Sequence, residues 1–237
     1  MSLATRDVAL RELMDDPACD PDRLRATLQR FDTINRLVSR WGPVYRSRIG
    51  PFLAALERPA RVLDLGCGGG DVLTHLAQRA ERDGLRIEWV GIDPDPRAIE
   101  VAHARTPGTR TTFLCTDSTA LLAAGESFDL VLSNHVLHHL TPDELGPFAD
   151  ESRRLSHGIV VHGDIERGRL AYVLYAVGIT PFAPGTFLRT DGLRSIRRSY
   201  LPAELAEALG SPWQVEKPAR FRVLAIAPGT ASGAADV

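Results

Sequence analysis

The segment 61–71, RVLDLGCGGGD, is an apolar run that breaks into glycines immediately before a predicted helix. Val62, Leu63 and Leu65 are typical of a central parallel strand, which helices cover on both faces. The glycines that follow lack a Cβ, so a ligand can lie against the main chain. From Val72 onward the apolar residues recur at helical spacing. A strand, a glycine loop and a helix in this order predict the first unit of a nucleotide-binding α/β fold.

The acidic residues around the glycine loop limit the choice of ligand. A dinucleotide fingerprint that starts at Gly66 and Gly68 requires a third glycine at position 71, where this chain has Asp71. A carboxylate at a helix N-terminus repels the phosphates that this end of a helix otherwise attracts. Asp64 adds a second negative charge. Two carboxylates favour a ligand with positive charge, such as S-adenosylmethionine, which carries an ammonium and a sulfonium.

Three further predicted strands also end in polar residues. The strand within 86–93 ends in Asp93, which is placed to accept hydrogen bonds from both hydroxyls of a ribose. NAD enzymes use the same device, so this residue alone does not separate the two ligands. The strand within 112–118 ends in Asp117, which suits the exocyclic amine of an adenine. The strand that begins at Phe128 continues into the polar run SNHVLHHL. The sequence therefore predicts one polar ligand edge.

Together these features resemble the class I S-adenosylmethionine-dependent methyltransferases. The resemblance covers 61–140 and depends on the order of the glycine motif, Gly91-Ile92-Asp93-Pro94, Asp117-Ser118 and 128–140. It implies an α/β fold with a doubly wound, mostly parallel seven-stranded sheet, the Rossmann-like methyltransferase fold. It also implies S-adenosylmethionine as cofactor and S-adenosylhomocysteine as product. The implied cofactor contacts are Asp64, Gly66, Cys67, Gly68 and Gly70 at the methionine moiety, Asp93 and Pro94 at the ribose, Asp117 and Ser118 at the adenine, and Ser133, Asn134 and His135 beneath the sulfonium.

A helical region is predicted before the first strand. Asp20 and Pro21 have the residue types of an N-cap and a first helical position, and an apolar stripe follows. A second helical stretch is expected near 44–56, interrupted at Gly50-Pro51. Because these helices precede the first strand, they either fold across its ligand edge as a lid or pack on the sheet in the ordinary way.

The chain is expected to form a single methyltransferase domain, residues 1–237. A fifth strand is predicted at 157–164. Two short strands at 213–216 and 221–227 predict an antiparallel C-terminal hairpin. The domain then divides into an N-terminal helical lid (1–58), a cofactor-binding core (59–164), a substrate cap inserted after the fifth strand (165–200), the last helix and C-terminal strands (201–229), and a disordered tail (230–237).

The predicted cap carries the information on the acceptor. It contains an apolar helix around 170–177 and then a loop broken by prolines, which together suggest a cover over an apolar small molecule. The arginines of the cap could pair with a substrate anion or with RNA phosphates, although salt bridges on a solvated face are the simpler interpretation. The expected substrate contacts are Tyr172, Tyr175, Phe182, Phe187 and Arg194.

Catalysis in such a pocket depends on alignment, and a base is needed only if the acceptor must lose a proton. Histidine suits this role near neutral pH, and the ends of the fourth and fifth strands deliver several. We expect His139 or His162 to be the base, with His135 as a further candidate. His135 and His139 could share a metal with His162 or Asp164, but imidazoles that line the cofactor pocket are the favoured interpretation, and no metal is expected.

Composition agrees with a globular enzyme. The formal net charge of −2 gives no general attraction to nucleic acid or to an anionic membrane. No apolar stretch approaches the roughly 20 residues that span a bilayer, and no signal peptide begins the chain. Cys19, Cys67 and Cys115 have no metal-binding spacing, which suits a reducing compartment. We therefore expect a cytoplasmic protein, monomeric or homodimeric, with neither nucleic-acid nor membrane partners.

The helix before the core and the segments after it are similar to bacterial methyltransferases of quinone and aromatic polyketide biosynthesis. This similarity implies methyl transfer to a small, largely apolar aromatic acceptor, a phenol, quinone or polyketide, with transfer to oxygen favoured over carbon. The alternatives are an RNA or protein methyltransferase, an NAD(P)-dependent oxidoreductase, and a cofactor-binding protein without catalysis.

Overall fold

The computed structural model describes residues 3–105 and 110–231. Within them the strands form one seven-stranded sheet in the order β3-β2-β1-β4-β5-β7-β6. Strands β1 to β5 are parallel, and β7 runs antiparallel to both β5 and β6. The predicted doubly wound sheet with an antiparallel C-terminal hairpin is thereby confirmed. The strands are β1 (Ala60–Leu65), β2 (Ile87–Asp93), β3 (Thr111–Cys115), β4 (Phe128–Asn134), β5 (Ser156–Ile165), β6 (Gln214–Glu216) and β7 (Arg222–Pro228).

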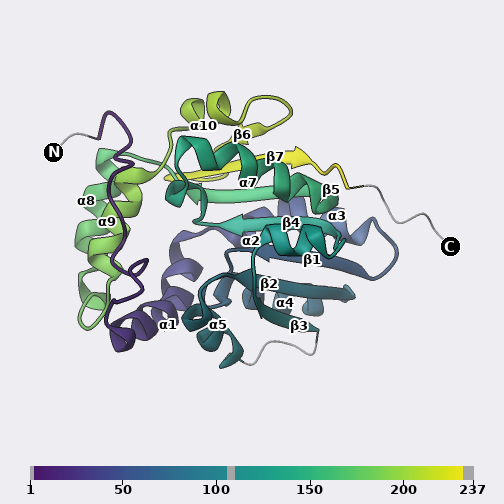
Figure 1. Ribbon diagram of the computed structural model, residues 1–237, viewed down its shortest axis with the longest axis horizontal. Coiled ribbons are helices and arrows are strands. Elements are labelled where there is room, and N and C mark those ends of the chain that lie inside the picture. Colours follow the sequence, from purple (N-terminus) through teal and green to yellow (C-terminus); the bar gives the residue numbers. More distant parts are fainter. Residues whose placement is uncertain (1–2, 106–109, 232–237) are drawn as a thin grey trace.

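Helices cover both faces of the sheet (Figure 1). Val62 and Leu132 point into one layer, while Leu63 and Val131 point into the other, because successive side chains of a strand alternate between faces. All four are fully buried, as the apolar run in the sequence indicated. The first layer contains α2 (Trp41–Val44), η1 (Tyr45–Ile49), α3 (Gly50–Ala54) and α4 (Asp71–Arg82), and the second contains α6 (Ser118–Ala123), α7 (Pro142–Arg154) and α10 (Pro202–Leu209).

The order of the strands positions the site. Strand β1 lies between β2 and β4, so the chain continues to one side after β1 and returns to the other side after β3. Such a reversal leaves a crevice at the carboxyl ends of the strands, where open α/β sheets bind ligands. A short turn, η2 (Leu137–His139), follows β4 at this edge.

Helix α1 (Pro21–Val38) begins where the sequence predicted. The Asp20 carboxylate accepts hydrogen bonds from the backbone N–H groups of Asp22 and Arg23, which caps the helix. Leu24 and Leu28 pack against α5 (Pro96–His103) and Phe187. The first helix therefore packs on α5, beside the carboxyl edge of the sheet, and also contacts the segment after β5.

The predicted break at Gly50-Pro51 is wrong. The chain is helical from Trp41 onward, and Gly50 and Pro51 begin α3. The Gly50 N–H donates to the Tyr45 carbonyl and closes the π-helical turn η1. Pro51 is the second residue of α3, near the start of a helical segment, where a proline is tolerated.

The segment after β5 contains two long helices rather than one helix and a loop. They are α8 (Arg169–Gly178) and α9 (Leu188–Arg198), joined through the short turn η3 (Thr180–Phe182). Helix α9 was not predicted because it is rich in arginine and carries few apolar residues. The last helix, α10, begins at Pro202.

Residues 3–19, here called the N-terminal strap, run along the two helices of the cap (Figure 1). The Asp191 carboxylate of α9 accepts the Leu13 N–H at 2.8 Å and the Met14 N–H at 3.0 Å. The buried Arg167 guanidinium donates to the Leu3 carbonyl at 3.0 Å. Segments more than 150 residues apart in the sequence thus form one wall of the site.

The predicted tail, 230–237, is only partly described. The Thr230 N–H donates to the Arg153 carbonyl, and the Ala231 N–H donates to the Ser156 carbonyl. Residues 232–237 lie outside the described part of the chain. A separate observation is that no described helix is both long enough and apolar enough to cross a membrane.

Candidate active site

A cavity of about 870 Å³ lies at the carboxyl edge of the sheet and extends beneath α1, α8 and α9. One end is lined by the glycine loop after β1 and by polar residues after β2 and β4. The other end is lined by apolar side chains of the helices. The cavity therefore joins the region predicted for the cofactor to the region predicted for the acceptor.

The glycines of the loop have different roles. Gly68 has a φ of 54°, and a Cβ there would meet no atom within 4 Å, because the residue faces the cavity. A Cβ on Gly66 would lie 2.7 Å from a methyl carbon of Val136, and one on Gly70 would lie 2.6 Å from the Phe113 ring. Gly66 and Gly68 line the cavity together with Cys67, whereas Gly70 packs against Phe113, away from it.

Three carboxylates surround this loop. Asp64 is 2% exposed, and its Oδ1 has no hydrogen-bond partner among the described residues. Burial, together with the negative charges of Asp71 and Asp93, raises the pKa of Asp64. Asp93 accepts the backbone N–H groups of Gly68 and Asp95, each at 2.9 Å. A cationic ligand would both pair with the unpartnered oxygen and offset the mutual repulsion, so these residues fit an ammonium group.

Asp71 is fixed by α1 as well as by its position at the start of α4. The Asn35 side-chain amide of α1 donates to the Asp71 carboxylate at 2.8 Å. Burial raises the pKa of this carboxyl, while the hydrogen bond from Asn35 acts in the opposite direction. Both residues line the cavity, so α1 is tied directly to the glycine loop.

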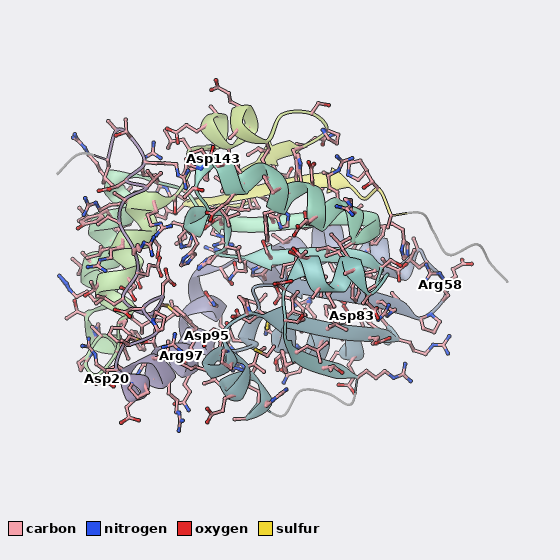
Figure 2. All side chains as sticks on the ribbon, in the orientation of Figure 1. Asp20, Arg58, Asp83, Asp95, Arg97 and Asp143 are labelled. Atoms are coloured by element: carbon pink, nitrogen blue, oxygen red, sulfur yellow. The ribbon has the colours of Figure 1, made fainter. Side chains whose placement is uncertain are left out.

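The end of β2 contributes Pro94 and Asp95 to the cavity wall. Asp95 caps α5 by accepting the Arg97 N–H at 2.8 Å, and it pairs with the Arg97 guanidinium at 2.7 Å. In Figure 2 both lie close to α1, whereas Arg58, which pairs with Asp129, lies at the opposite edge of the sheet. The site is therefore confined to the carboxyl ends of the strands.

Asp117 and Ser118 are not among the residues that line the cavity. Asp117 caps α6 by accepting the Ala120 N–H at 2.8 Å, and the Ser118 hydroxyl donates to Glu151 of α7 at 2.5 Å. These two residues were predicted at the adenine. In the structure Asp117 caps α6 and Ser118 joins α6 to α7, and their contact with adenine stays a prediction.

The residues after β4 are held by a buried arginine. Arg222 donates to the Asn134 side-chain oxygen at 2.9 Å and to Nε2 of His135. Burial and this guanidinium lower the pKa of His135, so its ring is neutral and its Nε2 already accepts a hydrogen bond from Arg222. His135 lines the cavity but is not placed to act as a base. The sequence analysis did not identify Arg222. The feature that could have indicated it is a charged residue at the first position of an otherwise apolar strand.

His138 lies between two buried carboxylates. Its Nδ1 is 2.7 Å from Asp164 and its Nε2 is 3.2 Å from Glu12 of the strap. Burial lowers the pKa of His138, but the carboxylates outweigh it and raise the pKa to about 9. Burial raises the pKa of Glu12, and the two histidines outweigh it and lower the pKa to about 2. Glu12 was missed because nothing in the strap sequence marks it.

The three candidate bases lie in different environments. His139 has a side chain that is 31% exposed, and it lines the cavity with Nδ1 at 3.2 Å from Asp15. His162 is fully buried between the hydroxyls of Ser133 and Ser152. Its ring stacks on Trp213 in the second helical layer. Burial lowers the pKa of His162 to about 3, and its ring does not reach the cavity. The prediction of His162 as base is therefore corrected, and His139 is the remaining candidate.

The five predicted substrate residues are not brought together. Tyr175 and Phe182 line the apolar end of the cavity. Tyr172 is not among the lining residues, Phe187 packs beneath α1, and Arg194 donates to the Arg11 carbonyl of the strap. The apolar end also includes Phe31, Ile34, Leu174, Ile179, Leu188 and Ile196.

Comparison with known proteins identifies the class. Residues 62–157 match the family described as "Methyltransferase domain". Together with the strand order and the glycine loop, this match defines a methyltransferase fold. The predicted resemblance to the class I S-adenosylmethionine-dependent methyltransferases is thereby confirmed for residues 62–157. The cofactor of this class is S-adenosylmethionine.

Two curated relatives illustrate the range of similarity. A ubiquinone biosynthesis O-methyltransferase from Azorhizobium caulinodans is 33% identical over 158 residues, which cover 64% of this chain and 57% of the relative. Aklanonic acid methyltransferase DauC from Streptomyces sp. strain C5 is 28% identical over 205 residues, 83% of each chain. The chain thus spans about half the length of the ubiquinone relatives it matches.

Solved structures agree on the fold. Human N-acetylserotonin methyltransferase, in complex with S-adenosylmethionine, has a TM-score of 0.60 at 15% identity, over 86% of this chain and 55% of that one. The plantazolicin methyltransferase BamL, in complex with S-adenosylhomocysteine, has a TM-score of 0.57 at 16% identity, over 80% and 70%. At these identities the likeness concerns the architecture alone.

Proposed function

We propose that this chain transfers the methyl group of S-adenosylmethionine to an oxygen atom of a small, largely apolar aromatic acceptor, such as a phenol, a reduced quinone or a polyketide. One observation carries the proposal: a single cavity joins the acidic glycine loop to an apolar chamber under α1, α8 and α9. Its volume of about 870 Å³ lies within the range of small-molecule sites.

At the cofactor end, Asp64 would bind the ammonium group, and Gly68 leaves room for the ligand beside the main chain. Asp93, held by two backbone N–H groups, would bind the ribose. When bound, the cofactor supplies an electrophilic methyl group on a positively charged sulfur. The chain supplies carboxylates that favour a cationic ligand over a phosphate.

At the acceptor end, the helices exclude water and align the acceptor oxygen with the methyl carbon. Well-oriented proximity is worth on the order of 7–11 kcal/mol of the barrier. His139 lies at the boundary between the polar and apolar parts of the cavity. We propose that its imidazole takes the proton of the acceptor hydroxyl, which leaves an oxyanion to attack the methyl group.

The relatives and the arrangement of charge support a small-molecule acceptor. The names of the two relatives refer to ubiquinone biosynthesis and to aklanonic acid. The arginines of α9, considered above as contacts to RNA, instead bind the strap: Arg194 donates to the Arg11 carbonyl, and Arg197 pairs with Asp7 at 2.5 Å. These contacts and the net charge of −2 argue against a nucleic-acid surface.

A panel of acceptors tests the proposal. Purified protein is incubated with methyl-labelled S-adenosylmethionine and either apolar phenols, reduced quinones, aromatic polyketides, RNA or denatured protein. The proposal predicts label in the apolar aromatic compounds, with the methyl group on oxygen by NMR. Label found only in RNA or protein would refute the substrate class, and label on a ring carbon would refute the choice of oxygen.

A further inference from the structure

Three side chains that line the cavity lie close together. They are Glu12 of the strap and the neighbouring residues His138 and His139 of η2. One ligand atom from each lies within 4.8 Å of the other two. The Glu12 Oε1 atom is 3.2 Å from the His138 Nε2 atom and 3.8 Å from the His139 Nε2 atom. All three residues line the cavity.

Both imidazoles are oriented by a second carboxylate. The Nδ1 atom of His138 is 2.7 Å from Asp164, and the Nδ1 atom of His139 is 3.2 Å from Asp15. A carboxylate on Nδ1 holds the N–H there, so a metal ion that displaces the proton on Nε2 would meet a lone pair directed toward Glu12. Metal-binding histidines are oriented in this way, by a carboxylate or carbonyl on the ring nitrogen that does not bind the metal.

We propose that Glu12, His138 and His139 bind one divalent transition-metal ion of the Zn²⁺ type. Two imidazoles and one carboxylate form a known catalytic zinc ligand set, and tetrahedral ligands on such an ion lie about 3.4 Å apart. The observed separations of 3.2 and 3.8 Å fall on either side of this value. Two nitrogen ligands disfavour Mg²⁺, which prefers oxygen.

These three ligands differ from the metal ligands that the sequence suggested, which were His135 and His139 with His162 or Asp164. The pairing of His135 with His139 is not formed, because Arg222 occupies Nε2 of His135. His162 lies outside the cavity, and Asp164 orients His138 from its Nδ1 side. The contribution of Glu12 depends on the strap folding over the cap, so no local spacing in the sequence indicates it.

Three protein ligands leave a fourth position on the ion toward the cavity. An acceptor hydroxyl bound there would be acidified by the metal. In the metal-bound protein His139 would be a ligand, so the base role proposed above for this residue belongs to the metal-free protein. This catalytic consequence rests on the proposed function, whereas metal binding itself does not. The two can therefore be tested separately.

The experiment measures metal binding without an acceptor. Untagged protein, freed of metal with a chelator, is titrated with Zn²⁺ by calorimetry and with Co²⁺ by visible absorption. We expect one Zn²⁺ per chain and Co²⁺ bands of a four-coordinate nitrogen and oxygen site. Glu12→Gln and His139→Gln should each weaken Zn²⁺ binding at least 100-fold. Asp15→Asn should weaken it about 10–100-fold, because it removes an orienting carboxylate.

His75→Gln is the matched control, because this half-buried histidine of α4 lies away from the cluster and should leave Zn²⁺ binding unchanged. Folding of each variant is checked by its affinity for S-adenosylhomocysteine. The proposal is overturned if the wild type binds less than one equivalent of Zn²⁺, or if folded Glu12→Gln and His139→Gln bind it as tightly as the wild type. In that case the cluster is an ion pair between Glu12 and His138.

Discussion

Gly68 and Gly125 both adopt positive φ values, 54° and 73°, and a Cβ at either position would meet no atom within 4 Å. Only Gly68 lies on the cavity. Alanine at a left-handed position costs roughly 1–2 kcal/mol, so Gly68→Ala and Gly125→Ala should lose similar stability. Calorimetry should show at least tenfold weaker binding of S-adenosylhomocysteine by Gly68→Ala alone. Equal affinities in the two variants would place the cofactor elsewhere.

His162 should make the protein sensitive to acid. Its pKa is lowered to about 3 in the folded chain by burial, from an ordinary value near 6.5. Between these values the unfolded state binds the proton and the folded state does not, so stability falls as the pH falls through this window. The slope is up to about 1.4 kcal/mol per pH unit.

Urea unfolding of the wild type and of His162→Gln, measured from pH 7 to pH 4, checks this expectation. Glutamine keeps hydrogen-bonding groups near Ser133 and Ser152 but does not titrate. The variant should be less stable at pH 7 and show a flatter dependence on pH. Parallel curves would mean that other groups govern the acid sensitivity.

The sequence predicted residues best where a strand leads straight into them. Asp64, Gly66, Gly68, Asp93 and His135 all line the cavity, because a parallel sheet brings the carboxyl ends of its strands to one edge. Glu12 and Arg222 could not be predicted in the same way. Each reaches the cavity through contacts with residues at least 87 positions away, and the local sequence does not show which residues these are.

At the scale of elements, the strap should depend on α9. Asp191 accepts two backbone N–H groups of the strap, and hydrogen bonds to a charged group are worth about 1.5–3 kcal/mol. Asp191→Ala should therefore release the strap and speed trypsin cleavage after the exposed Arg11 by about tenfold or more. Asp143→Ala, which changes an exposed aspartate of α7, should leave the cleavage rate unchanged (Figure 2).

Release of the strap should also affect the acceptor more than the cofactor. The strap carries Glu12 and Asp15 to the acceptor end of the cavity, while the glycine loop belongs to the sheet. Asp191→Ala is therefore expected to raise KM for the acceptor and to keep its affinity for S-adenosylhomocysteine. Unchanged cleavage and unchanged KM would show that the strap is held by other contacts.

Elements were predictable in proportion to their apolar periodicity. Buried strands and the apolar α8 stand out in the sequence, whereas α9 does not. Three of the arginines of α9 contact the strap: Arg194 donates to the Arg11 carbonyl, Arg197 pairs with Asp7, and Arg198 donates to the Leu10 carbonyl. A helix with few apolar residues that is stabilised in part by polar contacts to a distant segment gives only a weak apolar signal in the sequence.

At the scale of the whole molecule, the acidic cavity should discriminate between nucleotide cofactors. S-adenosylhomocysteine at about 100 times its Kd should stabilise the fold by about 2.7 kcal/mol, and NADH should give no stabilisation. The reason is that Asp64 and Asp71 favour an ammonium and repel a pyrophosphate. Thermal unfolding with each compound makes the comparison. Stabilisation by NADH alone would contradict the assignment of the loop.

The most direct measurement is a single turnover. Enzyme in excess is loaded with methyl-labelled S-adenosylmethionine and mixed with an apolar phenol from the panel. We expect one labelled methyl group to reach the phenol oxygen for each S-adenosylhomocysteine formed. We also expect His139→Ala to slow this step most at low pH, where little phenolate forms unaided. Tight binding of S-adenosylhomocysteine without label in any small aromatic acceptor would contradict it.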